Sequence, residues 1–254
     1  MSEPVVLSIG TTHPWNVAGL GFDLRVAEAF GVRGLSVVAG VSAQDAKGLR
    51  AVFALPPDVV DAQLASIPMD EVDAIRVGAL VGRASVEAVA KFLSAHDDLP
   101  AVVDPVFGTT LGGTLLDDDG VAAFGDALAT LESVVLTPNI EEARRLLGGD
   151  AIDRDGLADA ATALRGRGPR AVLLKGGHLS GDPVDAFASK DGVELFSDER
   201  IGRQMRGTGC TLAMALACEL ARGLALRDAV QAARSYVRSR IVSHLKFGGI
   251  QVAY

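Results

Sequence analysis

Short runs of apolar and β-branched residues alternate along most of the chain with longer stretches in which apolar residues recur at helical spacing. The short runs predict strands at Val5–Ile9, Ser36–Val41, Ala74–Val77, Ala101–Asp104, Val134–Thr137 and Ala171–Lys175. The longer stretches predict helices near Gly21–Phe30, Pro57–Ser66, Ser85–Ala95, Gly120–Leu131, Ile140–Leu147 and Leu157–Arg165. Strands and helices that alternate throughout are typical of βαβ units around a mainly parallel sheet. We therefore expect one α/β domain over residues 1–254, with helices on both faces of its sheet.

The pattern changes after Lys175. Two apolar runs, Val184–Ala188 and Val193–Phe196, are separated by a Lys-Asp-Gly sequence, which predicts a late β-hairpin because Asp-Gly between apolar runs favours a tight turn. Two further helices are expected, Thr211–Arg222 and Leu226–Leu245. The first is apolar on nearly every side, so we expect it to be buried.

The composition excludes some partners and compartments. Twenty-four Lys and Arg residues against 32 Asp and Glu give a net charge of −8, which repels nucleic acid and an anionic membrane surface alike. We expect no signal peptide and no membrane span, because no segment has the required pattern. The two cysteines, Cys210 and Cys218, lie in one predicted helix about 12 Å apart, which is too far for a disulfide. A reduced, cytoplasmic protein is therefore expected.

Polar and glycine-rich segments follow the predicted strands, and in an open parallel sheet ligands bind beyond the carboxyl ends of the strands. These segments are Gly10-Thr11-Thr12-His13, Ser42-Ala43-Gln44-Asp45, Asp104-Pro105, Thr137-Pro138-Asn139 and Lys175-Gly176-Gly177-His178. We therefore expect several reactive side chains to converge on one edge of the sheet. A further segment, Gly207–Thr211, opens the buried helix. Its two glycines let backbone N–H groups turn toward an anion at the positive end of the helix dipole.

In order and spacing, these segments resemble the hydroxymethylpyrimidine kinase branch of the ribokinase-like superfamily, from about Ser8 to Ala233. Gly207–Leu212 is similar to the nucleotide-side signature of that branch, in which Cys stands where sugar kinases of the superfamily carry Asp. Leu136–Asn139, followed by Glu142, resembles its Asn-x-x-Glu motif. Further matches are Val103-Asp104-Pro105-Val106, Leu115-Leu116-Asp117-Asp118 and Leu174-Lys175-Gly176-Gly177-His178. The resemblance implies a ribokinase-like fold and transfer of the γ-phosphate of ATP to a primary alcohol.

The resemblance also implies roles for single residues. The catalytic group would consist of Gly207, Thr208, Gly209 and Cys210. In it the backbone amides face the transferred phosphoryl group and the Cys210 thiolate acts as base, with a pKa that the helix N-terminus lowers. A purely packing role for Cys210 stays open, because phosphoryl transfer needs little help from a base when positioning and charge neutralisation dominate.

Nucleotide and metal contacts are implied in the same way. Phosphate contacts are expected from Lys175, Asn139, Thr137 and Arg206, the last standing where the family usually has His. Glu142 is expected near Mg²⁺, and Asp104 is expected to hold a metal-bound water, because Mg²⁺ prefers oxygen ligands and keeps several waters. Structural alternatives stay open for three of them: Asp104 as a turn residue, Glu142 as a solvated helix residue and Lys175 as a surface lysine.

The segment Ser42-Ala43-Gln44 resembles the loop in which a Gln of the family reads the aminopyrimidine ring, and a Gln amide offers both a donor and an acceptor. Pyridoxal kinases with the Cys-type signature lack this Gln. The resemblance therefore favours the hydroxymethyl group of 4-amino-5-hydroxymethyl-2-methylpyrimidine as acceptor and leaves open whether its monophosphate is a second one. The expected substrate contacts are Gln44, Gly19, Asp23 and Val41.

Two departures from the family pattern bear on the substrate. Trp15, Asn16 and Val17 stand where Ser-Gly-Gly is usual, and Trp15 could stack on an aromatic ring, exclude one, or pack on a neighbouring helix. Thr110-Leu111 replaces a Lys-Ser pair. The alternatives are a kinase for pyridoxal or another aromatic alcohol, and a non-catalytic ligand-binding homologue. Relatives are commonly dimers, so the resemblance also implies a homodimer.

Overall fold

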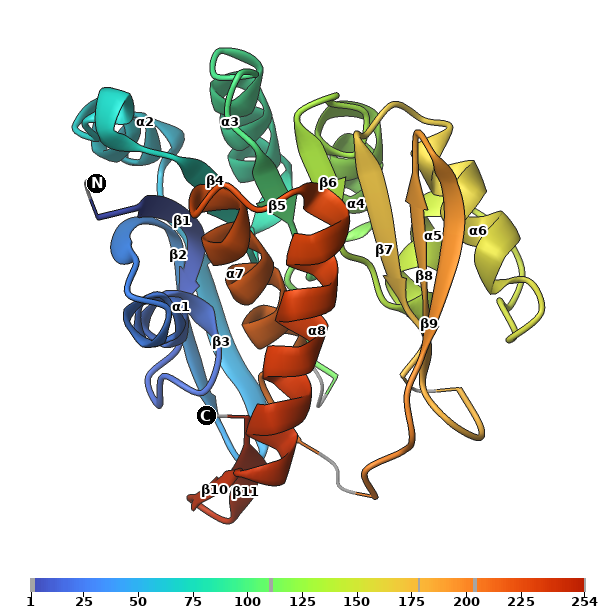
Figure 1. Ribbon diagram of the computed structural model, residues 1–254. Helices are drawn as coiled ribbons and strands as arrows, with labels where there is room; N and C mark the ends of the chain where they lie inside the picture. The colour runs from blue at the N-terminus through green and yellow to red at the C-terminus, as the bar shows by residue number, and fades with distance from the viewer. Residues whose placement is uncertain (1–2, 110–111, 178, 203–204, 254) are drawn as a thin grey trace.

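The computed structural model describes residues 3–109, 112–177, 179–202 and 205–253, and it shows a central sheet with helices on both faces (Figure 1). The strands are β1 (Val5–Thr12), β2 (Arg33–Asp45), β3 (Gly48–Ala54), β4 (Ala74–Val77), β5 (Ala101–Val103), β6 (Val134–Leu136), β7 (Ala171–Lys175), β8 (Val184–Ser189) and β9 (Gly192–Ser197). Within the described residues they form one nine-stranded sheet in the order β3-β2-β1-β4-β5-β6-β7-β8-β9. Strands β2, β1, β4, β5, β6 and β7 pair in parallel, and β3, β8 and β9 join antiparallel. The predicted mainly parallel sheet with a late hairpin is confirmed.

The helices are α1 (Gly19–Ala29), α2 (Pro57–Ala65), α3 (Gly82–Ser94), α4 (Asp118–Ala123), α5 (Ile140–Leu147), α6 (Leu157–Arg165), α7 (Thr208–Ala221) and α8 (Leu226–Val242). A 3₁₀ turn at Met69–Glu71 precedes β4. The helix predicted over Gly120–Leu131 begins two residues earlier as α4, where the Asp117 side chain accepts the Gly120 N–H, and continues as a π-helical turn, Phe124–Leu128.

Strict alternation of strand and helix is broken at β2. This strand continues past Val41, its predicted end, and the chain turns directly into β3, which pairs antiparallel with it. The turn is stabilised because Asp45 Oδ1 accepts the Lys47 N–H at 2.7 Å and because Gly48 adopts φ +126°. The prediction of βα units throughout is therefore wrong here, and the β2–β3 ribbon forms one edge of the sheet.

The last helix is shorter than predicted. It ends at Val242 rather than at Leu245, and the chain then forms a hairpin of β10 (Leu245–Phe247) and β11 (Ile250–Val252). Gly248 and Gly249 connect these strands with φ +56° and +83°, a conformation that suits a two-residue hairpin turn.

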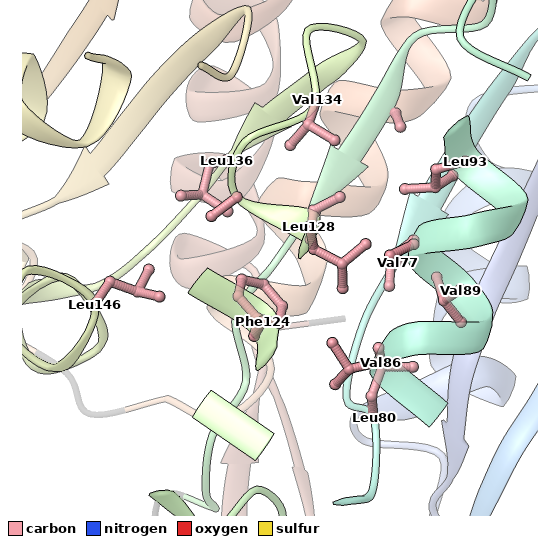
Figure 2. Packing of buried hydrophobic residues seen from close by; sticks show 14 of the residues in the cluster. Val77, Leu80, Val86, Val89, Leu93, Phe124, Leu128, Val134, Leu136 and Leu146 are labelled. Carbon is pink, nitrogen blue, oxygen red and sulfur yellow. The ribbon is translucent and has the colours of Figure 1, made fainter. Parts of the chain in front are cut away.

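Two apolar clusters hold the layers together. One lies between the sheet and α2 to α6, where Figure 2 shows Val86 and Leu93 of α3 packed in the same cluster as Phe124 and Leu128. The other joins the sheet to α1, α7 and α8, which lie together on the opposite face (Figure 1). Helix α7 is buried from Thr211 to Glu219, as predicted. No helix within the described residues is long and apolar enough to cross a bilayer.

Candidate active site

A row of buried charged side chains crosses the carboxyl edge of the sheet. Arg76 of β4 places Nη1 2.9 Å from Asp23 Oδ2 of α1, and Nη2 3.9 Å from Asp104 Oδ2. Asp104 follows β5, and its Oδ1 lies 2.8 Å from Nζ of Lys175, the last residue of β7. These four side chains are at most 16% exposed. Because they alternate in sign away from water, each one restrains the position of the next.

Arg76 is a site residue that the sequence pattern did not reveal. It lies between Ile75 and Val77, and the alternation of a strand directs its side chain to the same face as Ala74, which packs in the cluster around α7. The guanidinium covers Gly78, where any side chain would collide with Nη1. The signal that could have found it is a charged residue within a short, fully buried strand, since arginine is seldom buried without a partner.

Asp23, an expected substrate contact, is fully buried, and Ser8 Oγ donates to its Oδ2 at 2.8 Å. Burial raises the pKa of Asp23 to about 6, because lost hydration outweighs the attraction of Arg76 and the hydrogen bond from Ser8. In the described part of the chain, Asp23 Oδ1 and Arg76 Nε and Nη2 have no hydrogen-bond partner. Buried polar atoms are normally paired, so these atoms are available to a ligand.

The glycine-rich start of α7 has the geometry of an anion-binding helix terminus. Gly207 caps the helix with φ +83°, and a side chain there would come within 2.7 Å of the Val17 carbonyl oxygen. Thr208–Cys210 forms the first helical turn. Backbone N–H groups in the first turn have no intrahelical acceptor, so they are free to bind an anion.

Gly209 brings this helix start against the charged row. A Cβ atom on Gly209 would lie 3.4 Å from Lys175 Nζ and 3.7 Å from Asp104 Oδ2. Thr137, at the end of β6, donates from Oγ1 to Asp104 Oδ1 at 3.1 Å. The structure therefore brings Gly209, Lys175, Asp104 and Thr137 together, and their expected phosphate and metal contacts stay predictions. Lys175 is not the surface lysine that the sequence left open as an alternative.

Asn139 and Glu142 form a capping box at the start of α5. Asn139 Oδ1 accepts the Glu142 N–H at 2.9 Å, and Glu142 Oε2 accepts the Asn139 N–H at 2.7 Å. Burial raises the pKa of Glu142 to about 7, although Lys175 favours its charged form. Glu142 is thus not a fully solvated helix residue. Among the described residues, no three His, Cys, Asp or Glu side chains are grouped as a ready-made metal site.

Cys210 lies in the first turn of α7 and interacts with the Arg76 guanidinium. Burial raises the pKa of its thiol, whereas Arg76 and the N–H of Gly19, the first residue of α1, favour the thiolate. The expected lowering by the helix N-terminus is therefore wrong in direction, because desolvation is the largest effect. Both cysteines are free, and Cys218 is buried in the core, where its pKa rises to about 12.

The expected substrate residues Gln44 and Val41 lie on β2. Gln44 Nε2 donates to Ser42 Oγ at 2.9 Å, and Ser42 Oγ donates to the Thr12 carbonyl oxygen at 2.5 Å, which ties the Gln44 amide to the end of β1. The Val41 side chain is 47% exposed and lies opposite Phe53 of β3. Substrate contacts by Gln44 and Val41 stay predictions.

Arg206 links the β2–β3 turn to the segment that enters α7. Its Nη1 donates to the Asp45 carbonyl oxygen at 3.3 Å, and its backbone N–H donates to the Gln251 carbonyl oxygen at 3.0 Å. Arg206 also lowers the pKa of the buried His13, adding to the effect of burial. The guanidinium therefore contacts backbone in this structure, and its expected phosphate contact stays a prediction.

Trp15 packs on the C-terminal hairpin. Its ring meets Phe247 edge-on, with the centroids 5.4 Å apart, and covers Gly248, where a Cβ would lie 2.5 Å from the indole. The backbone N–H of Trp15 donates to His13 Nδ1 at 3.1 Å. Of the three interpretations of this residue, the contacts favour packing, although the partner is a hairpin and not a helix.

Trp15→Ala is accordingly expected to lower the free energy of unfolding by about 1–2 kcal/mol, since it removes an edge-on aromatic pair and half-buried apolar area. Phe247→Ala should cost a similar amount, and the double variant should cost less than the sum. Urea unfolding measures all three. Leu195→Ala, which shortens a β9 side chain on a residue that is 55% exposed, is the control. Fully additive losses would show that the two rings do not interact.

Two sequence interpretations concern residues outside the described ranges. Thr110-Leu111, which replaces the Lys-Ser pair of the family, is one of them, and the His178 position of the Lys175–His178 segment is the other. The roles inferred for these residues stay predictions.

Known proteins match the chain over nearly its whole length. The family model described as phosphomethylpyrimidine kinase matches residues 14–253. A hydroxymethylpyrimidine/phosphomethylpyrimidine kinase of Streptomyces coelicolor is 38% identical over 98% of this chain and 93% of its own. One of the same description from Rhizobium meliloti is 38% identical over 93% of this chain and 90% of its own.

Solved structures match the fold as well. A Bacillus subtilis pyridoxal kinase bound to ADP superimposes with a TM-score of 0.89 at 27% identity, covering 99% of this chain and 97% of its own. A Clostridium difficile phosphomethylpyrimidine kinase gives 0.83 at 27% identity, covering 94% of this chain and 100% of its own. The chain therefore belongs to the phosphomethylpyrimidine kinase family, and it is an ATP-dependent kinase with a ribokinase-like fold.

Proposed function

We propose that this kinase phosphorylates the hydroxymethyl group of 4-amino-5-hydroxymethyl-2-methylpyrimidine with ATP, in thiamine biosynthesis. The observation that carries the proposal is the position of the α7 N-terminus. It borders the Asp104–Lys175 pair through Gly209 and the Asp23–Arg76 pair through Cys210. The Asp104–Lys175 pair serves the nucleotide phosphates, and the Asp23–Arg76 pair serves the alcohol. The relatives named above carry this activity in their descriptions.

The reaction follows from this placement. The alcohol oxygen attacks the γ-phosphorus, the bond between that phosphorus and the β,γ-bridging oxygen breaks, and ADP leaves. Cys210 takes the hydroxyl proton. The amides of Gly207–Cys210 and the Lys175 ammonium stabilise the charge on the transferred group, and they need no reorganisation because the helix start and the buried ion pair already fix them.

Magnesium is the metal that suits these residues. Glu142 is a carboxylate whose pKa is raised chiefly by burial, although Lys175 favours its charged form, and Asp104 of the charged row also pairs with Lys175. Mg²⁺ usually keeps several waters and binds through one or two carboxylates together with substrate phosphates. Two carboxylates therefore suit it, and a closed cage of protein ligands is not required. We assign Glu142 and Asp104 to Mg²⁺, Asp104 through a water. The bound ion would neutralise charge on the phosphates.

Asp23 supports an aminopyrimidine as acceptor. Its Oδ1 is a fully buried acceptor without a partner among the described residues. An exocyclic amine would supply the missing donor, while the Gln44 amide would pair with the ring edge. Pyridoxal is the second candidate substrate, because a pyridoxal kinase superimposes with a TM-score of 0.89.

An ADP-release assay with the hydroxymethylpyrimidine, its monophosphate, pyridoxal and no acceptor tests the proposal. The pyrimidine should give the highest kcat/KM, and activity with the monophosphate would add the second phosphorylation. A higher kcat/KM for pyridoxal would replace the proposed substrate by the second candidate. No activity with any acceptor would favour a non-catalytic binding role.

Gln44→Ala should reduce kcat/KM for the pyrimidine by a factor that corresponds to roughly 1–3 kcal/mol, because a buried partner is left unpaired. The KM for ATP should barely change, since Gln44 lies on β2 and the phosphate residues follow β5 to β7. Steady-state kinetics with each substrate varied in turn measures both values. An unchanged kcat/KM for the pyrimidine would remove Gln44 from the substrate site.

Two broader expectations also remain proposals. We infer a homodimer, supported by the exposed Val41 and Phe53 that lie opposite each other on the β2–β3 ribbon. Light scattering coupled to size-exclusion chromatography would measure its mass. We also infer a cytoplasmic location, in keeping with two free cysteines.

A further inference from the structure

The backbone on both sides of the Lys175 Cα atom is fixed by hydrogen bonds. The Lys175 N–H donates to the Pro138 carbonyl oxygen at 2.8 Å. The next amide, that of Gly176, donates to the side chain of Asp185 at 3.0 Å. Asp185 lies opposite Lys175 in the antiparallel pair of β7 and β8. The direction in which Lys175 leaves the sheet thus depends on a carboxylate outside the charged row.

Asp185 is itself held by an arginine of α8. Arg234 Nε donates to Asp185 Oδ2 at 2.8 Å, and Arg234 Nη2 donates to Asp198 Oδ2 at 2.7 Å. The guanidinium also lies over the Phe196 ring, 4.9 Å from its centroid. The Arg234 and Asp185 side chains are only 12% and 14% exposed, so solvent competes little for these bonds. Asp185 therefore has one oxygen for Arg234 and one for the Gly176 amide.

The segment after Gly176 has a separate support. Arg200 donates to the carbonyl oxygens of Gly177, Leu179 and Gly181. Gly176 itself packs so closely on Val184 that a side chain would collide with the Val184 carbonyl oxygen. These contacts can hold Gly177, Leu179 and Gly181 in place without Asp185. The Gly176 N–H, in contrast, would lose its acceptor.

We propose that Asp185, held by Arg234, is a positioning residue that orients Lys175 toward the nucleotide phosphates. The proposal rests on the assignment of Lys175 to the nucleotide. Loss of the carboxylate would leave a buried N–H unpaired and let the Lys175 backbone shift, and a misplacement of about 1 Å can cost on the order of 10²-fold in rate. The effect should fall on ATP and not on the alcohol, because Asp23 and Arg76 lie on other elements.

The test compares four variants by binding of a non-hydrolysable ATP analogue, by the KM of each substrate and by melting temperature. Asp185→Ala should weaken analogue binding about tenfold and raise the KM for ATP by a similar factor, leaving the KM for the alcohol unchanged. Asp185→Asn keeps a carbonyl oxygen for the Gly176 amide and should restore most of the affinity. Arg234→Met should fall between them.

Arg227→Met is the matched control. Arg227 is also on α8, pairs with Glu194 at 2.6 Å and lies 5.7 Å from the centroid of the same Phe196 ring. Among the described residues, its other polar contacts are to Asp228 and Gln231 of the same helix, and not to the segment after Lys175. Its removal should lower the melting temperature slightly and leave nucleotide affinity at the wild-type value. If Asp185→Ala likewise lowered only the melting temperature, its role would be structural and the proposal overturned.

A double-variant cycle with Lys175→Ala completes the test. Once the ammonium is gone, Asp185→Ala should cause no further loss of nucleotide affinity. An additive tenfold loss would show that Asp185 does not act through Lys175. Wild-type affinity in Lys175→Ala alone would overturn the phosphate role of Lys175 and this proposal with it. Preference of the wild-type enzyme for pyridoxal would overturn only the proposed substrate.

Discussion

Arg76→Met should destabilise the protein by about 3–5 kcal/mol, because it leaves the Asp23 carboxylate buried without its cation. Urea unfolding would show this loss as a lower midpoint with an unchanged slope. Arg83→Met is the control, since Arg83 makes exposed ion pairs with Glu87 and Asp119 and its loss should lower the midpoint far less. Equal losses in the two variants would mean that the buried row contributes no more than a surface pair.

The double variant Arg76→Met with Asp23→Asn separates stability from chemistry. It removes both partners of the 2.9 Å ion pair and leaves neutral groups of similar size, so most of the lost stability should return. Activity should not return, since Cys210 would lose the cation that favours its thiolate and the substrate would lose the Asp23 carboxylate. Recovery of both stability and kcat would show that Arg76 is only a structural residue.

Elements bounded by strong local signals could be predicted from the sequence. The ends of α5 match the prediction, because Asn139 and Glu142 cap its start and Gly148 adopts the left-handed conformation just after its end. The bounds of β4 and β7 also match, since both are short segments of mostly apolar residues buried on both faces of the sheet. In these segments local preference and tertiary burial agree.

Elements that depend on distant partners could not be predicted from the sequence. Strand β3 has no clean alternation, and its existence depends on pairing with β2 through a turn at Lys47. The C-terminal hairpin covers Trp15, a contact across most of the chain that no local pattern encodes. The helical spacing of the preceding residues extended the predicted helix to Leu245, although the Gly248-Gly249 pair was a visible turn signal.

In the candidate site, too, some features could be predicted from the sequence and others could not. The order of the motifs placed Asp104, Thr137 and Lys175 at one edge, because carboxyl ends of parallel strands meet there, and in the structure Thr137 and Lys175 both contact Asp104. The sign of the Cys210 pKa shift was wrong, because the sequence shows a helix N-terminus but not how deeply its first turn is buried. Arg76 can be recognised as the charge partner of Asp23 only when the structure shows on which face of β4 its side chain lies.

Cys210→Ala should lower kcat by ~10²–10⁴-fold, the usual contribution of a general base, while ATP binding stays nearly intact. Binding should survive because the backbone N–H groups of Gly207–Cys210 and the Lys175 ammonium do not depend on the thiol. Single-turnover kinetics and binding of a non-hydrolysable ATP analogue measure the two quantities. Cys218→Ala, which shortens a buried core thiol, controls for loss of packing within α7.

The direction in which kcat changes with pH follows from the raised pKa of Cys210. Burial raises the Cys210 pKa, so the thiol is protonated at neutral pH and the thiolate fraction grows tenfold for each pH unit below that pKa. The kcat of the wild-type enzyme should therefore rise with pH through the neutral range. Cys210→Asp installs a base whose ordinary pKa is far lower, so it should recover part of the activity lost in Cys210→Ala and move the rise to lower pH. If Cys210→Ala turned over at the wild-type rate with both substrates saturating, the thiol would not be the base, and catalysis would depend on positioning and the anion hole alone.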